Sequence, residues 1–279
     1  EASNDFALVV SNSIKSWSDL AGQPIGVFSP GASSDILCHK LLEANGLSGT
    51  QINCVGQGDD PTRTQAMLAG KSVGTVIEPF DIITALVTGK YHILASVPQI
   101  LPNLLFSVLY TSRAYASAHP DIIAKITEAA LLADQWAHNE TAWISKEQVE
   151  FPGTNTTVAG AAWKVWMAMN IWDPYGGLSA SKLNYSMNYF VNISSISSTL
   201  APNYWSDLSY QGTAIQTVGN FTGPLLGYPD NSIPKLNVSI PGVPSVIISN
   251  PGRLFGEGSS TGIFFAVPVE SSWNSGRGF

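Results

Sequence analysis

Hydrophobic and polar positions alternate in two different ways along the first 110 residues. Short runs rich in β-branched and aromatic side chains predict strands at residues 6–10, 24–28, 51–55, 74–77, 91–96 and 104–110. Between these runs, apolar residues recur at helical spacing and predict helices at residues 33–44, 61–69 and 79–87. Strands that alternate with crossover helices indicate βαβ units and a largely parallel sheet, so the predicted fold class is α/β.

The second half of the chain has the apolar spacing of long helices. One such pattern begins at His119-Pro120-Asp121, and two more cover residues 158–169 and 181–191. We interpret the ridge of Trp163 and Trp166 on the middle helix as core packing, not as a platform for a ligand.

The helical period disappears beyond Gly227. Pro, Gly and Ser dominate there and interrupt short apolar runs. We therefore predict a β or irregular C-terminal extension over residues 227–279 that contributes nothing to a binding cleft.

The composition indicates a globular chain with few surface ions. Of 279 residues, 44% are hydrophobic and 12% are charged, about half the usual charged share, which suits an extracytoplasmic protein. The net charge of −7 and the scattered 13 basic residues argue against a nucleic-acid partner. No apolar run approaches the roughly 20 residues of a transmembrane helix. The first residues, Glu-Ala-Ser-Asn-Asp, have neither a basic start nor an apolar region, so any secretion signal is absent or already removed.

Two cysteines are too few for a disulfide scaffold. The predicted helix at residues 33–44 should lie across the strand that holds Cys54, so we predict a disulfide between Cys38 and Cys54, with two buried thiols as the alternative. With no CxxC motif or Cys/His cluster along the chain, no metal site is expected.

Six Asn-X-Ser/Thr sequons could carry glycans if the chain passes through a glycosylating secretory route. They begin at Asn139, Asn155, Asn184, Asn192, Asn220 and Asn237.

Several segments, taken in order, resemble a known family. They are residues 16–27 (Ser-Trp-Ser-Asp-Leu-Ala-Gly-Gln-Pro-Ile-Gly-Val), residues 29–35 (Ser-Pro-Gly-Ala-Ser-Ser-Asp), residues 41–47 (Leu-Leu-Glu-Ala-Asn-Gly-Leu), residues 63–71 (Arg-Thr-Gln-Ala-Met-Leu-Ala-Gly-Lys), Ile77-Glu78-Pro79-Phe80, His119-Pro120-Asp121, Gly176-Gly177-Leu178 and Tyr204-Trp205-Ser206-Asp207. Their order and spacing resemble the periplasmic substrate-binding proteins of ABC importers, of the nitrate, sulfonate and taurine type, whose relatives also bind thiamine pyrimidine precursors. The resemblance spans roughly residues 6–215 and departs from the family at Lys71-Ser72-Val73-Gly74, where an acidic position is lost.

The resemblance implies a type II periplasmic-binding-protein-like bilobal fold. Residues 1–23 would end lobe one and form the first hinge, residues 24–103 would form the α/β lobe two, and residues 104–226 would return through the hinge and complete lobe one with helices. Family members carry about 80 to 100 residues before the Asp-Leu-Ala-Gly region, a substantial part of a domain. These residues, the first half of lobe one, are missing here, so the sequence is either a piece of a longer protein or that of a protein that has dispensed with half of one lobe.

The function that the resemblance implies is capture of a small anionic or zwitterionic organic molecule for an ABC permease, without chemistry. A non-catalytic structural or adhesive cell-surface protein on the same fold, able to self-associate, is the alternative. The missing half-lobe, the low charge and the Pro/Gly-rich extension favour that alternative.

The first candidate site is the turn that leads from the strand at residues 24–28 into the following helix. Gly31, Ala32, Ser33 and Ser34 could hold a carboxylate, sulfonate or phosphate, because the first N–H groups of a helix lack intrahelical partners and lie at its positive end. The alternative is that Ser33 or Ser34 only caps the helix.

The second and third candidates follow later strands and helices. Glu78 and Asp81 could pair with a ligand amine while Phe80 packs on its apolar part, or the two carboxylates could simply complement a helix dipole. Trp172, Tyr175 and Gly176 lie in a segment that could close over a ligand or be an ordinary loop. We expect Arg63, inside a helix, to form a surface ion pair.

No enzymatic apparatus is recognisable. Residues 258–262 match the pattern G-x-S-x-G, but no strand-turn-helix context surrounds them. The histidines at positions 39, 92, 119 and 138 share no metal-ligand spacing. We therefore expect no catalytic residues, no cofactor and no bound metal.

Overall fold

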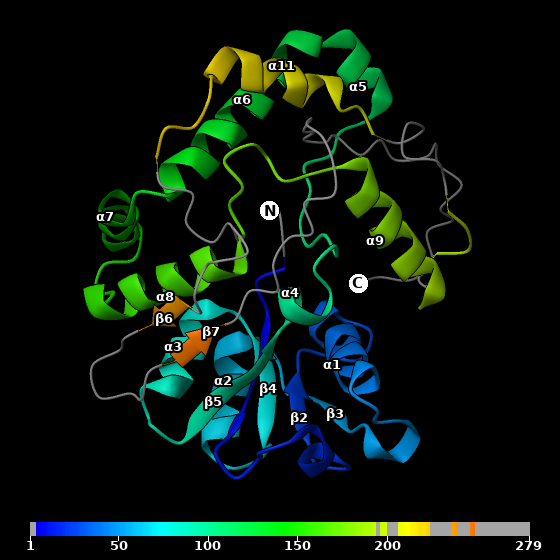
Figure 1. Ribbon diagram of the computed structural model, residues 1–279, viewed down its shortest axis with the longest axis vertical. Coiled ribbons are helices and arrows are strands. Elements are labelled where there is room, and N and C mark those ends of the chain that lie inside the picture. Colours follow the sequence, from blue (N-terminus) through cyan, green and yellow to red (C-terminus); the bar gives the residue numbers. More distant parts are fainter. Residues whose placement is uncertain (1–3, 194–195, 200–205, 224–235, 239–245, 249–279) are drawn as a thin grey trace.

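A mixed five-stranded sheet forms the centre of the lower half of the molecule in Figure 1. The computed structural model describes residues 4–193, 196–199, 206–223, 236–238 and 246–248. The strands are β1 (Ala7–Ser11), β2 (Ile25–Val27), β3 (Cys54–Gly56), β4 (Gly74–Ile77) and β5 (Tyr91–Ser96), in the spatial order β3-β2-β4-β1-β5.

Strand β1 gives the sheet its mixed character. It lies between β4 and β5 and pairs with both in antiparallel orientation, whereas β2 pairs in parallel with β3 and β4. The four strands that alternate with helices therefore run in one direction, as their pattern predicts, and β1 runs against them. The prediction of a largely parallel sheet did not include this reversed strand, because the pattern does not show that β1 pairs with β4 and β5 and not with β2, from which only a 3-10 turn separates it.

Residues 104–110 do not form the predicted strand. They have no regular secondary structure apart from an isolated bridge residue at Tyr110, and they belong to neither sheet. The backbone N–H of Leu105 instead donates to the Ser186 hydroxyl at 3.0 Å. One backbone N–H of this apolar run thus finds a side-chain partner where the pattern alone predicts a neighbouring strand.

Helices surround the sheet and continue beyond it. Those connected to the strands are α1 (Ser33–Ala44), α2 (Asp60–Leu68), α3 (Pro79–Leu86) and α4 (Val97–Ile100), with 3-10 turns at Trp17–Leu20 and Gly49–Gln51. The later helices are α5 (Arg113–Ala118), α6 (Pro120–Ala137), α7 (Glu140–Glu150), α8 (Thr156–Met169), α9 (Ala180–Asn192) and α11 (Ser209–Val218). In Figure 1, α5, α6 and α11 lie together at the top, away from the sheet, while α8 lies beside α3.

The core follows directly from the alternation of side chains along β1. Ala7 and Val9 face one cluster with residues of α2, α3 and α8, whereas Leu8 and Val10 face a second cluster with residues of α1 and α9. Because all four side chains are fully buried, the strand reads as a continuous apolar run, as a central strand covered on both faces should. Burial of each larger side chain stabilises the fold by roughly 1.5–3 kcal/mol.

The predicted disulfide is confirmed. Cys38 on α1 and Cys54 at the start of β3 are bonded, with 6.4 Å between their Cα atoms. Leu37, Leu41 and Leu42 on the same helix are buried in the second cluster, so α1 is held to the sheet by apolar contacts as well as by the bond.

The described part of the C-terminal extension is a two-stranded antiparallel pair. Strand β6 (Leu236–Val238) lies beside α8, and β7 (Val246–Ile248) lies beside β5. The rest of residues 227–279, including the G-x-S-x-G match, lies outside the described residues. Among the helices described, none combines the length and hydrophobicity that crossing a bilayer requires.

Candidate functional site

Two candidate segments follow neighbouring strands of the sheet. Parallel pairing joins Ile25 to Gly74 and Gly26 to Thr75, and the Thr75 hydroxyl donates to the Gly26 carbonyl at 2.9 Å. The carboxyl ends of β2 and β4 therefore meet at one edge. Helices α1 and α3 both begin there, at the place where open α/β sheets bind ligands.

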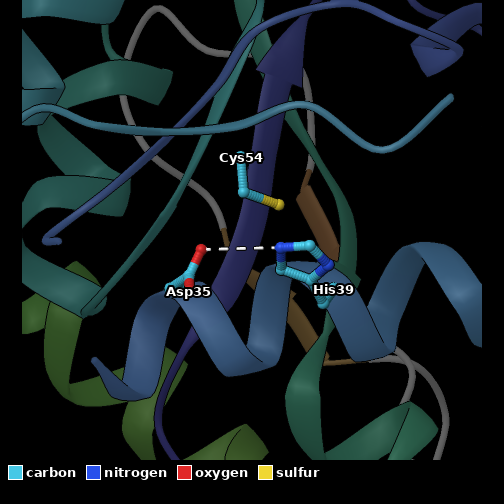
Figure 2. Close-up of side chains that lie close together, drawn as sticks. All are labelled: Asp35, His39 and Cys54. Carbon is cyan, nitrogen blue, oxygen red and sulfur yellow. Dashed lines mark ion pairs between the residues drawn. The ribbon is translucent and has the colours of Figure 1, made fainter. Parts of the chain in front are cut away.

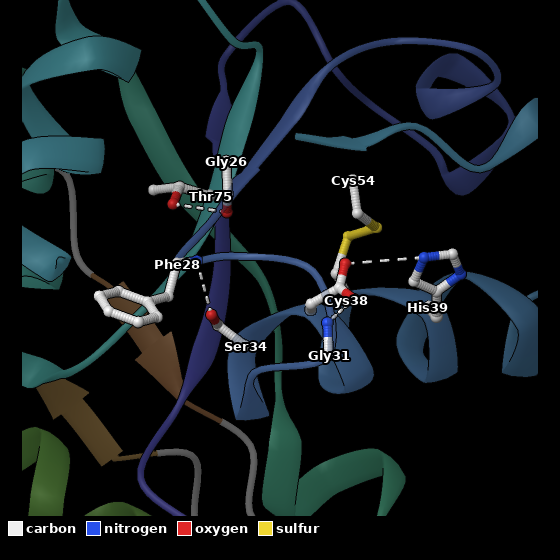
Figure 3. The surroundings of a disulfide bond; sticks show 9 residues. Gly26, Phe28, Gly31, Ser34, Cys38, His39, Cys54 and Thr75 are labelled. Atoms are coloured by element: carbon white, nitrogen blue, oxygen red, sulfur yellow. Dashed lines mark hydrogen bonds and ion pairs between the residues drawn. A yellow bond between two sulfur atoms is a disulfide. The ribbon is translucent and has the colours of Figure 1, made fainter. Parts of the chain in front are cut away.

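The β2–α1 turn (residues 28–34) is held by two internal hydrogen bonds, from Phe28 N to Ser34 Oγ at 2.9 Å and from Gly31 N to Asp35 Oδ2 at 2.8 Å. Figure 3 shows Phe28, Ser34 and Gly31 beside the disulfide. Gly31 has a φ of 80°, which a side chain with a Cβ rarely adopts. The carboxylate of Asp35 thus already occupies one of the N–H groups that the sequence assigns to a ligand.

Two other N–H groups of the same turn remain available. Ala32 is the N-cap residue and makes no side-chain capping bond, so the alternative that Ser33 or Ser34 caps the helix is wrong. Within the described residues, the N–H groups of Ser33 and Ser34 have no hydrogen-bond partner. The Ser33 side chain is exposed and that of Ser34 is buried.

Phe28 is a feature of this turn that the sequence reasoning missed. Its side chain is 51% exposed although it directly follows a buried strand. A large exposed aromatic residue beside free N–H groups offers an apolar surface next to an anion-binding one. Its place as the first residue of the turn, directly after β2, was the available signal.

The segment after β4 is tied to α2. The backbone N–H of Glu78 donates to Asp60 Oδ2 at 3.0 Å, and the other oxygen of Asp60 lies 2.5 Å from Arg63 Nη2. Glu78, Phe80 and Asp81 are each half-buried. Burial, followed by the nearby charge of Asp60, raises the pKa of Asp81 above its ordinary value.

Arg63 does not form the expected surface ion pair. Its side chain is 1% exposed, and besides contacting Asp60 it donates to the carbonyls of Val76 at 2.9 Å and Gly58 at 3.1 Å. A residue inside a helix is exposed only where no neighbouring element covers it, and β4 covers this face of α2. Arg63 is consequently a structural residue that ties α2 to β4.

Phe80 and Trp172 meet in an aromatic cluster with Trp143 and Trp166. The centroid of Phe80 lies 5.3 Å from that of Trp166 and 6.2 Å from that of Trp143, and Trp172 lies 5.5 and 5.9 Å from the same two rings. The cluster joins α3, α7 and α8 and the segment after α8. Most of its ring surface is therefore used in packing between helices.

The aromatic ridge of α8 is divided between core and cluster. Trp163 is buried and its indole N–H donates to the carbonyl of Ala137 at 2.7 Å, which agrees with the interpretation as core packing. Trp166 is half-buried and donates to Asp5 Oδ2 at 3.1 Å.

Three side chains hold the segment at residues 172–177. His138 Nε2 lies 2.9 Å from the Trp172 carbonyl, Gln135 donates to the Pro174 carbonyl at 3.1 Å, and Gln211 donates to the Tyr175 carbonyl at 2.5 Å. Tyr175 and Gly176 are half-buried, and Gly176 has a φ of 88°. The segment is thus tied to α6 and α11, and its role as a gate stays a prediction.

Replacement of Asp81 by Asn is expected to raise the free energy of unfolding at pH 7 by less than about 1 kcal/mol, because solvent screens a half-buried carboxylate. A carboxyl group whose pKa is raised on folding binds its proton more tightly in the folded state. Its ionised form therefore carries a penalty, a lower free energy of unfolding, at every pH above the folded pKa. The penalty disappears as the pH falls toward the ordinary value of 3.8. Denaturant unfolding of parent and variant between pH 7 and pH 4 would measure this.

The matched control for Asp81→Asn is Asp59→Ala. Asp59 accepts from Thr62 N at 3.0 Å, and hydrogen bonds from Thr62 lower the pKa of Asp59. Its variant should be less stable than the parent at pH 7, with a difference that shrinks in acid. Equal pH dependence for both variants would contradict the assignment of Asp81.

Five of the sequon asparagines are exposed. Asn184, Asn192 and Asn220 are surface residues, and Asn139 and Asn155 are exposed helix N-caps whose Oδ1 atoms accept backbone N–H groups. The side chain of Asn237 lies outside the described part of the structure. Glycosylation stays a prediction.

One group of side chains has donor atoms suited to a metal ion. Among the residues described, Asp35, His39 and Cys54 each offer one such atom, and these atoms lie within 4.8 Å of one another. The sequence analysis found no Cys/His cluster, because Cys54 comes from another element. The available signal was the spacing of Asp35, Cys38 and His39 on one helix face.

Comparisons with known proteins agree with the resemblance carried by the motifs. In the search of solved structures, a protein of Bordetella bronchiseptica RB50 is similar at 17% identity and a TM-score of 0.60, over 78% of this chain and 73% of that one. The alkanesulfonate-binding protein SsuA of Xanthomonas axonopodis pv. citri bound to MOPS gives 18% identity and a TM-score of 0.54, over 70% of this chain and 65% of that one. A putative periplasmic sulfonate-binding protein SsuA of Methylobacillus flagellatus KT gives 15% identity and a TM-score of 0.56, over 78% of this chain and 68% of that one.

At these identities the structural likeness shows the fold, which is the predicted periplasmic-binding-protein-like α/β fold. No curated protein matched the chain in sequence. The profile of the NMT1/THI5-like family matches residues 1–142, just over half of the 279 residues. The chain therefore belongs to the NMT1/THI5-like family.

Proposed function

We propose that this chain is the extracytoplasmic solute-binding component of an ABC importer and captures a small zwitterionic or anionic organic molecule without chemical change. The observation that carries the proposal is the pair of unpartnered N–H groups of Ser33 and Ser34 beside the exposed ring of Phe28. Both N–H groups lie at the positive end of α1, an arrangement that favours a sulfonate, carboxylate or phosphate. A membrane permease with its ATPase is the partner in this proposal.

The ligand's second charge would be recognised at the neighbouring strand end. Glu78 and Asp81 follow β4 just as the anion-binding turn follows β2. A carboxylate whose pKa is raised by burial and by a neighbouring acid gains from a cation placed beside it. A molecule with an anionic group at one end and an amine at the other fits both segments. The MOPS-bound alkanesulfonate-binding relative supports a sulfonate as the anionic group.

The domain division belongs to the same proposal. Residues 24–103 form lobe two, residues 104–226 return through the hinge and complete lobe one, and residues 227–279 form an extension outside the cleft. The sheet of lobe two also includes β1, which comes from residues 1–23, so that sheet draws on both sides of the boundary. Capture would follow from closure of the two lobes about the hinge, with residues 172–177 near the ligand.

The decisive variant is Ser33→Pro, which deletes one N–H group without disturbing the helix. Ser33 is the first residue of α1, where proline is well tolerated. Ala32 before it has a φ of −73° and a ψ of 164°, a conformation that proline also permits in its predecessor. A charge-assisted hydrogen bond is worth roughly 1.5–3 kcal/mol, so affinity should fall about tenfold or more.

The measurement is calorimetry of the full chain with three probes, 2-aminoethanesulfonate, ethanesulfonate and ethylammonium. The parent should bind the zwitterion most tightly and ethylammonium least. Ser33→Ala, which keeps the N–H group and removes only the exposed hydroxyl, is the matched control. If the proline variant folds normally and binds the sulfonates as tightly as the control does, the turn only begins a helix and the proposed site is wrong.

A further inference from the structure

Three side chains of α1 point at the edge strand β3. Asp35, Cys38 and His39 are spaced i, i+3 and i+4, so they lie on one helix face. Figure 2 shows Asp35 and His39 directed toward Cys54 on β3, with the dashed line between them marking the 3.7 Å from His39 Nε2 to Asp35 Oδ1. Cys54 Sγ, His39 and Asp35 offer donor atoms within 4.8 Å of one another.

The fourth donor of this cluster is the sulfur of Cys38, bonded to that of Cys54 at 2.07 Å. Two cysteines, one histidine and one aspartate are a ligand set that suits Zn²⁺, with bonds of about 2.3 Å to sulfur, about 2.0 Å to nitrogen and about 2.1 Å to oxygen. Around such an ion, neighbouring donor atoms lie about 3.3–3.8 Å apart. Small side-chain rotations would bring the present donors to that separation, but the disulfide forbids it.

We propose that reduction of the Cys38–Cys54 disulfide creates a zinc site made of Cys38, Cys54, His39 and Asp35. A dithiol reductant supplies two electrons and two protons. The sulfur–sulfur bond breaks, both cysteines become thiols, and the dithiol closes into its own disulfide. Zn²⁺ then replaces the two thiol protons, which pass into solvent, and the ion remains Zn²⁺.

The fold keeps the four donors near one another after reduction. Leu37, Leu41 and Leu42 of α1 remain buried against the sheet without the bond. Asp35 Oδ2 accepts from Gly31 N at 2.8 Å, which holds the carboxylate with its other oxygen toward His39. Such a hydrogen bond behind a ligand orients it for the metal.

The site is also accessible. Strand β3 is at the edge of the sheet, and the side chain of His39 is 45% exposed. A reductant and a metal ion can therefore reach the cluster without unfolding of the core.

The test compares the oxidised and the reduced full-length chain, with Zn²⁺ alone as the probe, in competition with a chromophoric chelator. The reduced parent should bind one Zn²⁺ at least about 100-fold more tightly than the oxidised parent, because only thiolates are zinc ligands. Zinc should also raise the thermal midpoint of the reduced form and leave that of the oxidised form unchanged. Binding of Co²⁺ in place of Zn²⁺ should produce thiolate-to-metal absorption in the reduced form.

Variants distinguish zinc binding at this site from zinc binding by the thiols of an unfolded chain. In the reduced state, His39→Asn and Asp35→Asn should each weaken zinc binding by about tenfold or more. His119→Asn, an exposed histidine outside the cluster, should bind as the parent does. Equal zinc affinity in the two redox forms, or unchanged affinity in both His39→Asn and Asp35→Asn, would overturn the proposal. Neither result bears on ligand capture, because the capture assay uses the oxidised chain without metal.

Discussion

Replacement of Arg63 by methionine is expected to lower the free energy of unfolding by about 3–5 kcal/mol. Methionine nearly preserves the length of the side chain but removes the charge that lies 2.5 Å from Asp60. It also leaves the carbonyls of Val76 and Gly58 without the donors they now have. The half-buried carboxylate of Asp60 then keeps only the Glu78 N–H group as compensation for its lost hydration. Chemical denaturation of parent and variant, with the midpoint and slope both fitted, measures the loss.

Two further variants test the explanation for Arg63. Lys164→Met removes an ion pair with Glu140 in which both side chains are about 40% exposed, and its effect should stay below about 1 kcal/mol. Adding Asp60→Asn to Arg63→Met should recover part of the loss, because it removes the unpaired charge and keeps an oxygen for the Glu78 N–H group. If Arg63→Met is no more destabilising than Lys164→Met, the buried guanidinium of Arg63 and its pair with Asp60 do not stabilise the fold.

Simultaneous replacement of Cys38 and Cys54 by alanine is expected to destabilise the protein by roughly 3 kcal/mol. The bond spans a sequence separation of 16 residues, and a cross-link of that length restricts the unfolded chain by about this amount. Denaturant unfolding of the oxidised parent and of the double variant measures the difference.

The control for the cysteine variant is the parent after reduction, in the presence of a chelator. It keeps both sulfur atoms in the core, so its loss of stability relative to the oxidised parent isolates the cross-link from packing. The two losses should agree to within about 1 kcal/mol. Two free thiols in the denatured, unreduced parent would show that the bond is absent and that the alternative of buried thiols holds.

Local patterns predicted the elements of the sheet well. The helix at residues 33–44 and the strands at residues 74–77 and 91–96 have the predicted bounds, because periodicity within a segment determines them. The direction of β1 and the conformation of residues 104–110 depend on partners 64 to 89 residues away. No periodicity within a segment carries that information.

The candidate sites show the same division between local and distant information. The free N–H groups at Ser33 and Ser34 follow from a glycine turn before a helix, which the sequence displays. The burial of Arg63 and the packing of Phe80 on Trp143 and Trp166 depend on how α2, α3, α7 and α8 meet. Asp35 lay inside the motif used for the family resemblance, yet its bond to Gly31 needs the three-dimensional turn.

The position of β1 in the sheet has a consequence for the order of folding. Its partners β4 and β5 begin at residues 74 and 91, so a ribosome releases β1 long before either partner exists. Until then, its fully apolar sequence Ala-Leu-Val-Val has two unpaired edges, a feature that favours association between nascent chains. The pairing of β2 with β3 and then with β4 joins residues closer in the chain than the partners of β1 are, and should form first, because closure of short loops is faster. Insertion of β1 then completes the sheet, and a chaperone that shields β1 until β4 and β5 are made should raise the yield of folded protein more than one that acts later.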